Sequence, residues 1–453
     1  MRSVKRLPPR ILTTVAAGSI GVLLVLSALT DARAQSAMKN QERQIASASE
    51  LLAAAADTTV AEIVVQSNVT GLPTFRLSPG QTLKGATSSV TLHFATGGDG
   101  VQLSSNNLIE SLELQTDVDR RALFNDTKVE HLGRLVLRNL RTIGTIRLLA
   151  NDKVRSGHVE AENVDIESAD ARGYTERPKG YGVEVISGAF VLWNQQADRG
   201  VTVTAELTGL TAGRAGTPVR GGGIFVGGAG ETGGRLIVSR LETGAVYSDG
   251  GIAAGTPDRI TGGVFVVSGA FVDRVVNRGP VTTYGPNDMA LDNWGADGDW
   301  TAEEKITSFG PSGIGFVNFG TIDVLRAKAP IETFGQGSRG YNVYTGTVHT
   351  AEFERIVTHA DGAVGIQISQ PVGQIKVHRG IETYGGTGDS LVKGVVVKLS
   401  AIALSIKPGA SARNITIAGG LITHGAGIIP LELHGTVDSL QITEGLTAAG
   451  GGF

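Results

Sequence analysis

The residues best suited to chemistry lie close together in one short stretch of the sequence, residues 285–300. This stretch holds four aspartates and two of the three tryptophans of the chain. Two carboxyl groups that flank a glycosidic bond can act as general acid and base, or as acid and nucleophile. We therefore predict a catalytic carboxylate pair that acts on a sugar, with Asp292 as the leading candidate and Asp288 or Asp297 as its partner.

Two other interpretations of this stretch stay open. Asp297-Gly298-Asp299 also fits a solvated turn, and oxygen atoms of Asp297, Asp299 and Asn293 could coordinate calcium. Apart from that calcium site, we expect neither a metal nor an organic cofactor. The sequence contains no Gly-x-Ser-x-Gly, Walker, His-Glu-x-x-His or dinucleotide-binding motif.

Aromatic and polar side chains at matching positions predict a surface that binds the substrate. Trp294 and Trp300 lie in the aspartate-rich stretch, and Asn342 and Tyr344 follow Asp292 and Trp294 at a distance of 50 residues. Aromatic rings offer apolar faces on which sugar rings can stack. The predicted substrate-binding residues are Trp294, Trp300, Arg339, Asn342 and Tyr344.

A repeat of 25 residues explains how such distant positions could meet. A hydroxyl residue recurs at this spacing, each time followed by a ring or histidine and preceded, two residues earlier, by valine or isoleucine. The hydroxyl residues are Thr283, Ser308, Thr333, Thr358 and Thr383, and the rings are Tyr284, Phe309, Phe334, His359 and Tyr384. Strand alternation places the aliphatic and hydroxyl residues on one face and the rings on the other.

Strands of this kind can bury their inward face only if the next turn of chain stacks on them about 4.8 Å away. The 64 glycines, without a collagen triplet, indicate many tight turns between short strands. The pattern therefore predicts an all-β solenoid, a single-stranded parallel β-helix in which each coil contains about 25 residues. We place this parallel β-helix domain at residues 59–453.

Two coils carry about 15 extra residues. Thr423 repeats the hydroxyl position 40 residues after Thr383, and Thr243 lies 40 residues before Thr283. Insertions in a solenoid are expected to form loops at one edge, where function tends to collect.

The amino-terminal half has the same character. Phe75–Gly85 and Val101–Leu114 alternate like short strands joined by turns, and Asn139 and Asn163 occupy equivalent turn positions 24 residues apart. Over roughly residues 60–450, these coils resemble the pectate-lyase-like superfamily of right-handed parallel β-helices. The resemblance implies a right-handed solenoid. Most members are secreted polysaccharide lyases, glycoside hydrolases, epimerases or esterases, and others are phage tailspikes or adhesin stalks.

The first residues have the pattern of a signal peptide rather than of a folded element. Four basic residues precede the apolar stretch Ile11–Leu29, and Ala32-Arg33-Ala34 offers a cleavage site after residue 34. We predict export to the periplasm or the extracellular space, with a retained membrane anchor as the alternative. No later stretch is long and apolar enough to span a membrane. Residues 35–58 are predicted to cap the first coil, with a helix over 41–56.

Charge and cysteine content narrow the partners. Residues 1–34 contain five of the 40 Lys and Arg and one of the 43 Asp and Glu, so the remaining chain has a net charge of −7. This charge argues against nucleic acid as a partner. The absence of cysteine excludes disulfides and thiolate sites.

Together these features predict an exported glycoside hydrolase or transglycosylase acting on a neutral or weakly charged oligo- or polysaccharide. One alternative is a non-catalytic surface or adhesin β-helix, whose regular ladders need no chemistry. The other is a polyuronate lyase, which could use a modest basic zone formed by Lys376, His378, Arg379, Lys393 and Lys398. A face of the solenoid could also support a homo-oligomer.

Overall fold

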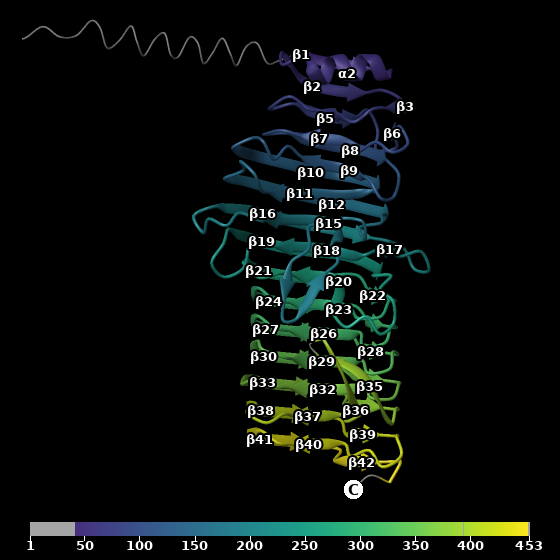
Figure 1. Cartoon of the computed structure of the whole chain (residues 1–453), viewed down its shortest axis with the longest axis vertical. Coiled ribbons are helices and arrows are strands. Elements are labelled where there is room, and N and C mark those ends of the chain that lie inside the picture. Colours follow the sequence, from purple (N-terminus) through teal and green to yellow (C-terminus); the bar gives the residue numbers. More distant parts are fainter. Residues whose placement is uncertain (1–40, 393, 452–453) are drawn as a thin grey trace, which may run out of the picture.

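More than half of the residues form β-strands, and the strands of the described chain are nearly all parallel and stack into one tall column (Figure 1). The computed structural model describes residues 41–392 and 394–451, so the predicted signal peptide lies outside the described residues. The two ends of the described chain lie at opposite ends of the stack (Figure 1). Within the described residues, the one helix is much too short to cross a membrane.

Strands that follow one another up the stack form three series. The first series pairs in the order β4 (Phe75–Arg76), β7 (Val101–Leu103), β9 (Arg121–Asn125), β11 (Thr145–Ala150), β15 (Gly188–Asn194), β18 (Gly222–Gly227), β20 (Arg259–Val266), β23 (Asp288–Asn293), β26 (Ile314–Asn318), β29 (Arg339–Val343), β32 (Val364–Ile368), β37 (Leu404–Ile406) and β40 (Leu431–Leu433).

The second series runs beside it along the whole stack. Its order is β2 (Val60–Val65), β5 (Thr82–Gly85), β8 (Leu108–Gln115), β10 (His131–Ile143), β12 (Ser156–Ser168), β16 (Thr202–Ala212), β19 (Arg235–Asp249), β21 (Ala270–Asn277), β24 (Ala296–Ala302), β27 (Thr321–Ala327), β30 (Thr347–Phe353), β33 (Val372–Val377), β38 (Ser411–Ile417) and β41 (Thr436–Ile442).

The third series is separate only in the carboxy-terminal half. It consists of β22 (Val281–Thr283), β25 (Ile306–Ser308), β28 (Ile331–Thr333), β31 (Ile356–Thr358), β34 (Ile381–Thr383), β39 (Leu421–Thr423) and β42 (Leu446–Ala448). The shorter strands β1 (Gln41–Ile45), β3 (Val69–Leu72), β6 (Thr91–Phe94) and β17 (Val219–Arg220) join the sheet of these two series at its edges.

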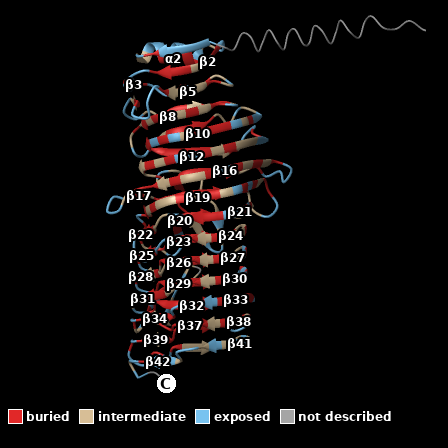
Figure 2. Cartoon of the chain, turned by 180° about the vertical axis from the view of Figure 1, so that it is seen from behind, coloured by how far each residue is buried: buried red, intermediate tan, exposed pale blue. Residues whose placement is uncertain are grey.

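The predicted columns are confirmed in the third series. Ile331 pairs with Ile306 of the preceding coil and with Ile356 of the following coil, and all three side chains are fully buried. The hydroxyl residues stack in the same way and are also buried. From β22 to β39 the first and third residue of each strand are buried, because every coil covers the inward side chains of its neighbour. Buried residues recur in coil after coil along the stack (Figure 2).

The outward rings also form the predicted column. Neighbouring rings from Tyr284 to Tyr384 are stacked nearly parallel, and the column extends to His424. Their centroids lie 4.3–5.4 Å apart, close to the strand spacing. Because the ring faces lie against each other, only ring edges are offered to solvent.

The structure corrects one register assignment at the insertions. Ser248, and not Thr243, pairs with Thr283. At the other insertion, residues 387–400 leave the stack as an antiparallel hairpin, and Leu404 pairs with Ile366 of the preceding coil. The strands of this hairpin are β35 (Thr387–Val392) and β36 (Val395–Ser400).

The predicted helix is shorter than expected. Gln41–Ile45 forms strand β1, which pairs with β2, and helix α2 spans only Ala48–Ala56. A capping box sets its start, since the Ser47 hydroxyl accepts from the Glu50 N–H and the Glu50 carboxylate accepts from the Ala46 N–H. Leu51 is fully buried, and α2 lies across the amino-terminal end of the stack (Figure 1).

Two apolar clusters hold the strands. The larger fills the interior of the stack, and a second lies on the outer face of the first series, around Phe265, Met289 and Val317. Residues of two hairpins take part in this second cluster: β13 (Lys179–Gly180) with β14 (Val183–Val185), and β35 with β36. The outward side chains of β20, β23 and β26 are therefore covered rather than solvated.

Candidate functional site

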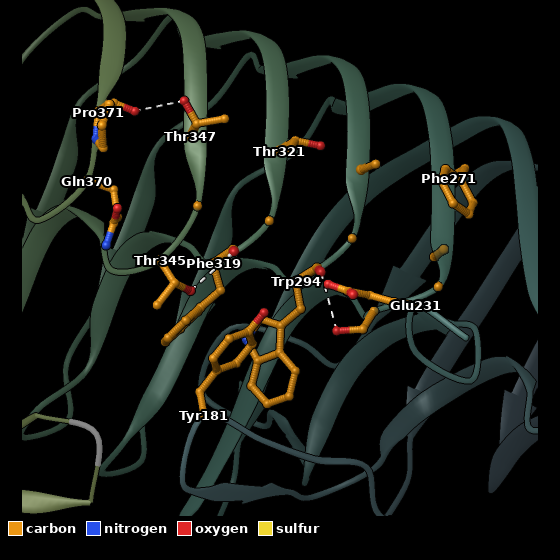
Figure 3. Close-up of a pocket in the computed structure, with 17 residues that line it drawn as sticks. Tyr181, Glu231, Phe271, Trp294, Phe319, Thr321, Thr345, Thr347, Gln370 and Pro371 are labelled. Atoms are coloured by element: carbon orange, nitrogen blue, oxygen red, sulfur yellow. Dashed lines mark hydrogen bonds between the residues drawn. The ribbon is translucent and has the colours of Figure 1, made fainter. Parts of the chain in front are cut away.

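An open groove of about 550 Å³ runs along the stack where the first series turns into the second (Figure 3). We call it the turn groove. One long side carries the rings Tyr181, Trp294 and Phe319, with Thr345 beside them. The other side carries Phe271, Ala296, Thr321 and Thr347, with Glu231 near one end and Gln370 and Pro371 at the other (Figure 3).

Strand pairing positions the second side. Phe271, Ala296, Thr321 and Thr347 pair in succession from β21 to β30. Three steps of strand spacing give this row a length of about 14 Å. The row is regular because it belongs to the stack, and Phe271 stands out from it with 42 % of its surface exposed.

Backbone packed against backbone forms the base of the groove between the two sides. A Cβ on Gly320 would lie only 2.0 Å from the Gly295 carbonyl oxygen, so no side chain fits there. Asparagines fix these turns: the side-chain oxygens of Asn293 and Asn318 accept from the N–H groups of Gly295 and Gly320 at 2.8 and 3.1 Å. Asn293 and Asn318 are thus turn residues, and this role explains their 25-residue spacing.

Tyr181 reaches the groove from the tip of the β13–β14 hairpin. Its φ of +51° and that of Gly182, +85°, fit the tight turn that joins two antiparallel strands. The Tyr181 ring stacks on Phe319 at 4.3 Å and meets Trp294 edge-on at 4.9 Å. Gly180 packs so closely on Trp294 that a Cβ would approach the indole to 2.7 Å.

The groove carries little charge. Among the described residues that line it, Glu231 is the only carboxylate, and there is no lysine, arginine or histidine. Burial raises the pKa of the Tyr181 phenol, a hydrogen bond with Thr345 opposes this, and the negative charge of Glu231 adds to the rise. Tyr181 therefore stays a neutral phenol at neutral pH.

Asp292, the leading catalytic candidate, lies behind this groove in the second apolar cluster. Its neighbours in the column are Phe265 and Val317, and its side chain is fully buried. Among the described residues, neither of its carboxyl oxygens has a hydrogen-bond partner. Burial raises the pKa of Asp292 well above its ordinary range, and the nearby Trp294 indole only partly offsets this.

Asp288 holds two turns together. One carboxyl oxygen accepts from the N–H groups of Gly250 and Gly285 at 2.9 and 2.8 Å. Burial raises the pKa of Asp288 to about 8, against the effect of these donors, and the negative charge of Asp249 adds to the rise.

Asp297 points the other way from Asp292, into the interior of the stack. It occupies a column between the core residues Val272 and Ile322, and burial raises its pKa well above the ordinary range. The structure thus does not bring Asp288, Asp292 and Asp297 together in one open site. Nor does the described chain contain a group of three or more His, Asp or Glu side chains arranged to hold a metal.

The predicted substrate-binding residues are divided in the same way. Trp294 lines the turn groove, but Trp300 is a core residue without exposed surface, whose Nε1–H donates to Asn277 at 2.9 Å. Trp300 points inward because alternation along β24 places it on the buried face. In this structure it offers no surface to a ligand.

Arg339, Asn342 and Tyr344 lie on the outward face around β29 but are covered. Arg339 and Asn342 have no exposed surface, and the only hydrogen bond of the Arg339 side chain within the described chain is a long one to the Gly337 carbonyl, at 3.4 Å. Tyr344 stacks on Phe319 at 5.0 Å, with the Arg339 guanidinium 5.8 Å above its ring.

The basic zone of the lyase alternative does not adjoin the groove. Lys398 pairs with Asp389 at 2.9 Å, and Arg379 forms an ion pair with Glu354. Lys393 lies outside the described residues.

Sequence reasoning missed the groove residues that come from loops and from plain strand positions: Tyr181, Glu231, Phe271, Thr321 and Thr347. The Tyr-Gly pair at 181–182 carries a usable signal, since it interrupts the repeating coils with a hairpin turn. The sequence does not indicate which coils of the stack the tip of this hairpin contacts.

Comparison of the chain with protein-family models, with curated proteins and with solved structures finds no match. The function must therefore be argued from the geometry of the site.

Proposed function

We propose that this protein is an exported parallel β-helix that binds a neutral or weakly charged oligo- or polysaccharide in the turn groove, without cleaving it. The proposal rests on the contrast between the residues that line the groove and the position of the three candidate catalytic aspartates. The open groove has rings, hydroxyls and a single carboxylate, whereas Asp288, Asp292 and Asp297 are buried outside it. Hydrolysis by the usual mechanism needs two carboxyl groups at the scissile bond.

The groove has the composition that sugar binding requires. Phe271 offers an exposed ring, Thr321 and Thr347 offer hydroxyl groups at successive steps of the same row, and Gln370 offers an amide at one end of the groove. Sugars bind to such surfaces through stacking of their apolar faces and hydrogen bonds from their hydroxyls. The described residues that line the groove carry no cationic side chain, which disfavours strongly anionic glycans.

The finer features of the fold belong to the same proposal. We take the stack to be right-handed, as in the pectate-lyase-like superfamily, with coils of about 25 residues and α2 as the cap of the first coil. Removal of residues 1–34 would deliver it to the periplasm or the extracellular space.

A glycan array followed by titration calorimetry tests the proposal. Wild-type protein should bind at least one neutral glycan, and Phe271→Ala should weaken that binding about tenfold, the loss of roughly one stacking contact. Phe309→Ala is the matched control, since Phe309 is as exposed as Phe271 but lies in the ring column outside the groove.

Three outcomes would contradict the proposal. If the wild-type protein bound no glycan, the proposed function would be wrong. If Phe309→Ala weakened glycan binding as much as Phe271→Ala does, the turn groove would not be the binding site. Release of reducing ends by the wild-type protein would instead support a glycoside hydrolase or transglycosylase.

A further inference from the structure

A small, partly enclosed cavity of about 40 Å³ adjoins the turn groove. Tyr181 and Phe319 line both spaces, so these two rings form the wall between them. The Asp292 side chain lines the cavity, and Met289, Ile314 and Leu391 supply apolar surface. We call this space the Asp292 cavity.

The Asp292 carboxyl is unusual for a buried group. It has no exposed surface, and the Trp294 indole, the one described donor near its oxygens, lies outside hydrogen-bond geometry. A buried polar group without a partner costs roughly 1–3 kcal/mol and calls for an explanation, often a ligand or solvent that belongs there. Within the second apolar cluster, Asp292 is best accommodated as the neutral acid, which can donate one hydrogen bond.

The shape and lining of the cavity select the group that would fill it. Its volume admits about three water-sized groups. A lone hydroxyl would leave the apolar walls uncovered, and a charged group would be poorly solvated among Met289, Ile314 and Leu391. An acetyl group combines a carbonyl oxygen, which accepts from the Asp292 acid, with a methyl group for the apolar wall.

We propose that the Asp292 cavity receives an acetyl substituent of a glycan whose sugar rings lie in the turn groove. The substituent can be attached through nitrogen or through oxygen, because the carbonyl and the methyl group are common to both. This inference rests on the proposed function, since the sugar must first occupy the groove.

A substituent that passes from the turn groove into the Asp292 cavity must cross the wall formed by Tyr181 and Phe319, so this wall has to open. Tyr181 sits on a two-residue turn at the hairpin tip, with 37 % of its surface exposed, and is held there by ring contacts with Phe319 and Trp294. Displacement of the tip joins the groove to the cavity without disturbing the strands of the stack.

Matched ligand pairs test the inference in the wild-type protein. Titration calorimetry would compare N-acetylated chito-oligosaccharides with their deacetylated forms, and O-acetylated xylo-oligosaccharides with their deacetylated forms. One hydrogen bond and one buried methyl group should make an acetylated member bind about tenfold more tightly. Preference within the first pair, the second pair or both identifies the attachment.

Three variants test whether the preference for acetylated glycans depends on Asp292. Asp292→Leu removes the donor and should abolish the preference, whereas Asp292→Asn retains an N–H donor and should keep most of it. Asp297→Leu is the matched control, because Asp297 is another buried carboxyl without a partner among the described residues but faces the interior of the stack. The Asp297→Leu variant should prefer acetylated glycans as strongly as the wild type does, and circular dichroism verifies that it is folded.

The outcomes separate the inference from the function on which it rests. Equal binding of acetylated and deacetylated glycans would overturn the acetyl site and leave the groove as a glycan site. A preference that survives in Asp292→Leu, or is lost in Asp297→Leu, would also overturn it. Binding of no glycan at all would overturn the proposed function first.

Discussion

At the scale of single residues, the buried aspartates behave as three different groups. Asp288 accepts two backbone hydrogen bonds, Asp292 faces a cavity, and Asp297 is enclosed by core side chains. What they share is a pKa raised by burial. Raised carboxyl pKa values are common at active sites, but here burial is the largest cause of each rise.

Asp288→Asn should remove part of the pH dependence of stability. The pKa of Asp288 rises from 3.8 to about 8 on folding, so the folded state binds the proton more tightly than the unfolded state. The stability that this group contributes is therefore complete below pH 4 and is lost as the pH rises to about 8. The asparagine oxygen can still accept from Gly250 and Gly285, and its side chain does not titrate.

Urea denaturation at a series of pH values checks this. The wild type should lose several kcal/mol of unfolding free energy relative to the variant between pH 4 and pH 8. Asp323→Asn, at an exposed position on β27, serves as control and should follow the wild type. Parallel curves for Asp288→Asn and the wild type would show that Asp288 is ionised in the folded protein.

At the scale of elements, the β13–β14 hairpin decides what the groove looks like. It supplies Tyr181 to one side of the groove, and β14 pairs with β20 of the stack through Val185 and Ile260. The hairpin contributes to the second apolar cluster and not to the interior core. It can therefore shift while the stack remains folded.

Gly180→Val should lift this hairpin from the stack. The new Cβ would lie 2.7 Å from the Trp294 ring, a distance that requires the hairpin or the indole to move. We expect faster proteolysis at the hairpin and a change in tryptophan fluorescence, with little change in the melting temperature. Gly173→Val is the control, since a Cβ there meets no atom within 4 Å. Equal proteolysis of both variants would contradict the close packing.

At the scale of the whole molecule, stability depends on the continuity of the interior columns. Each strand of the third series contacts its neighbours directly above and below, so a defect in one coil affects both adjoining interfaces. The ion pairs, by contrast, lie mainly at exposed positions and contribute little.

Ile356→Asp should destabilise the molecule by several kcal/mol, because it places an unpaired charge in a fully buried column. Chemical denaturation followed by circular dichroism measures the effect. Ile237→Asp carries the same substitution at an outward position, 39 % exposed on β19, and should change stability by about 0.5 kcal/mol or less. A wild-type denaturation curve for Ile356→Asp would refute the column.

The sequence by itself determined the stack: the inward aliphatic and hydroxyl columns, the outward rings and the equivalence of Asn139 and Asn163. These two asparagines lie inside strands β10 and β12 and not in turns between strands, yet both adopt positive φ and their side chains hydrogen-bond to each other at 3.1 Å, as residues in register would. Alternation and spacing record which face of a strand a side chain occupies, and stacking converts that local property into columns.

Only the tertiary structure decided which outward side chains stay open to solvent. Asp292 and Arg339 occupy outward positions, yet packing around the β13–β14 and β35–β36 hairpins covers them. Tyr181 reaches the turn groove by the same route, more than 100 residues from Trp294 along the chain. The repeat specifies where each strand residue lies on the stack. The place where an inserted hairpin packs depends on contacts between distant segments, which no local sequence pattern encodes.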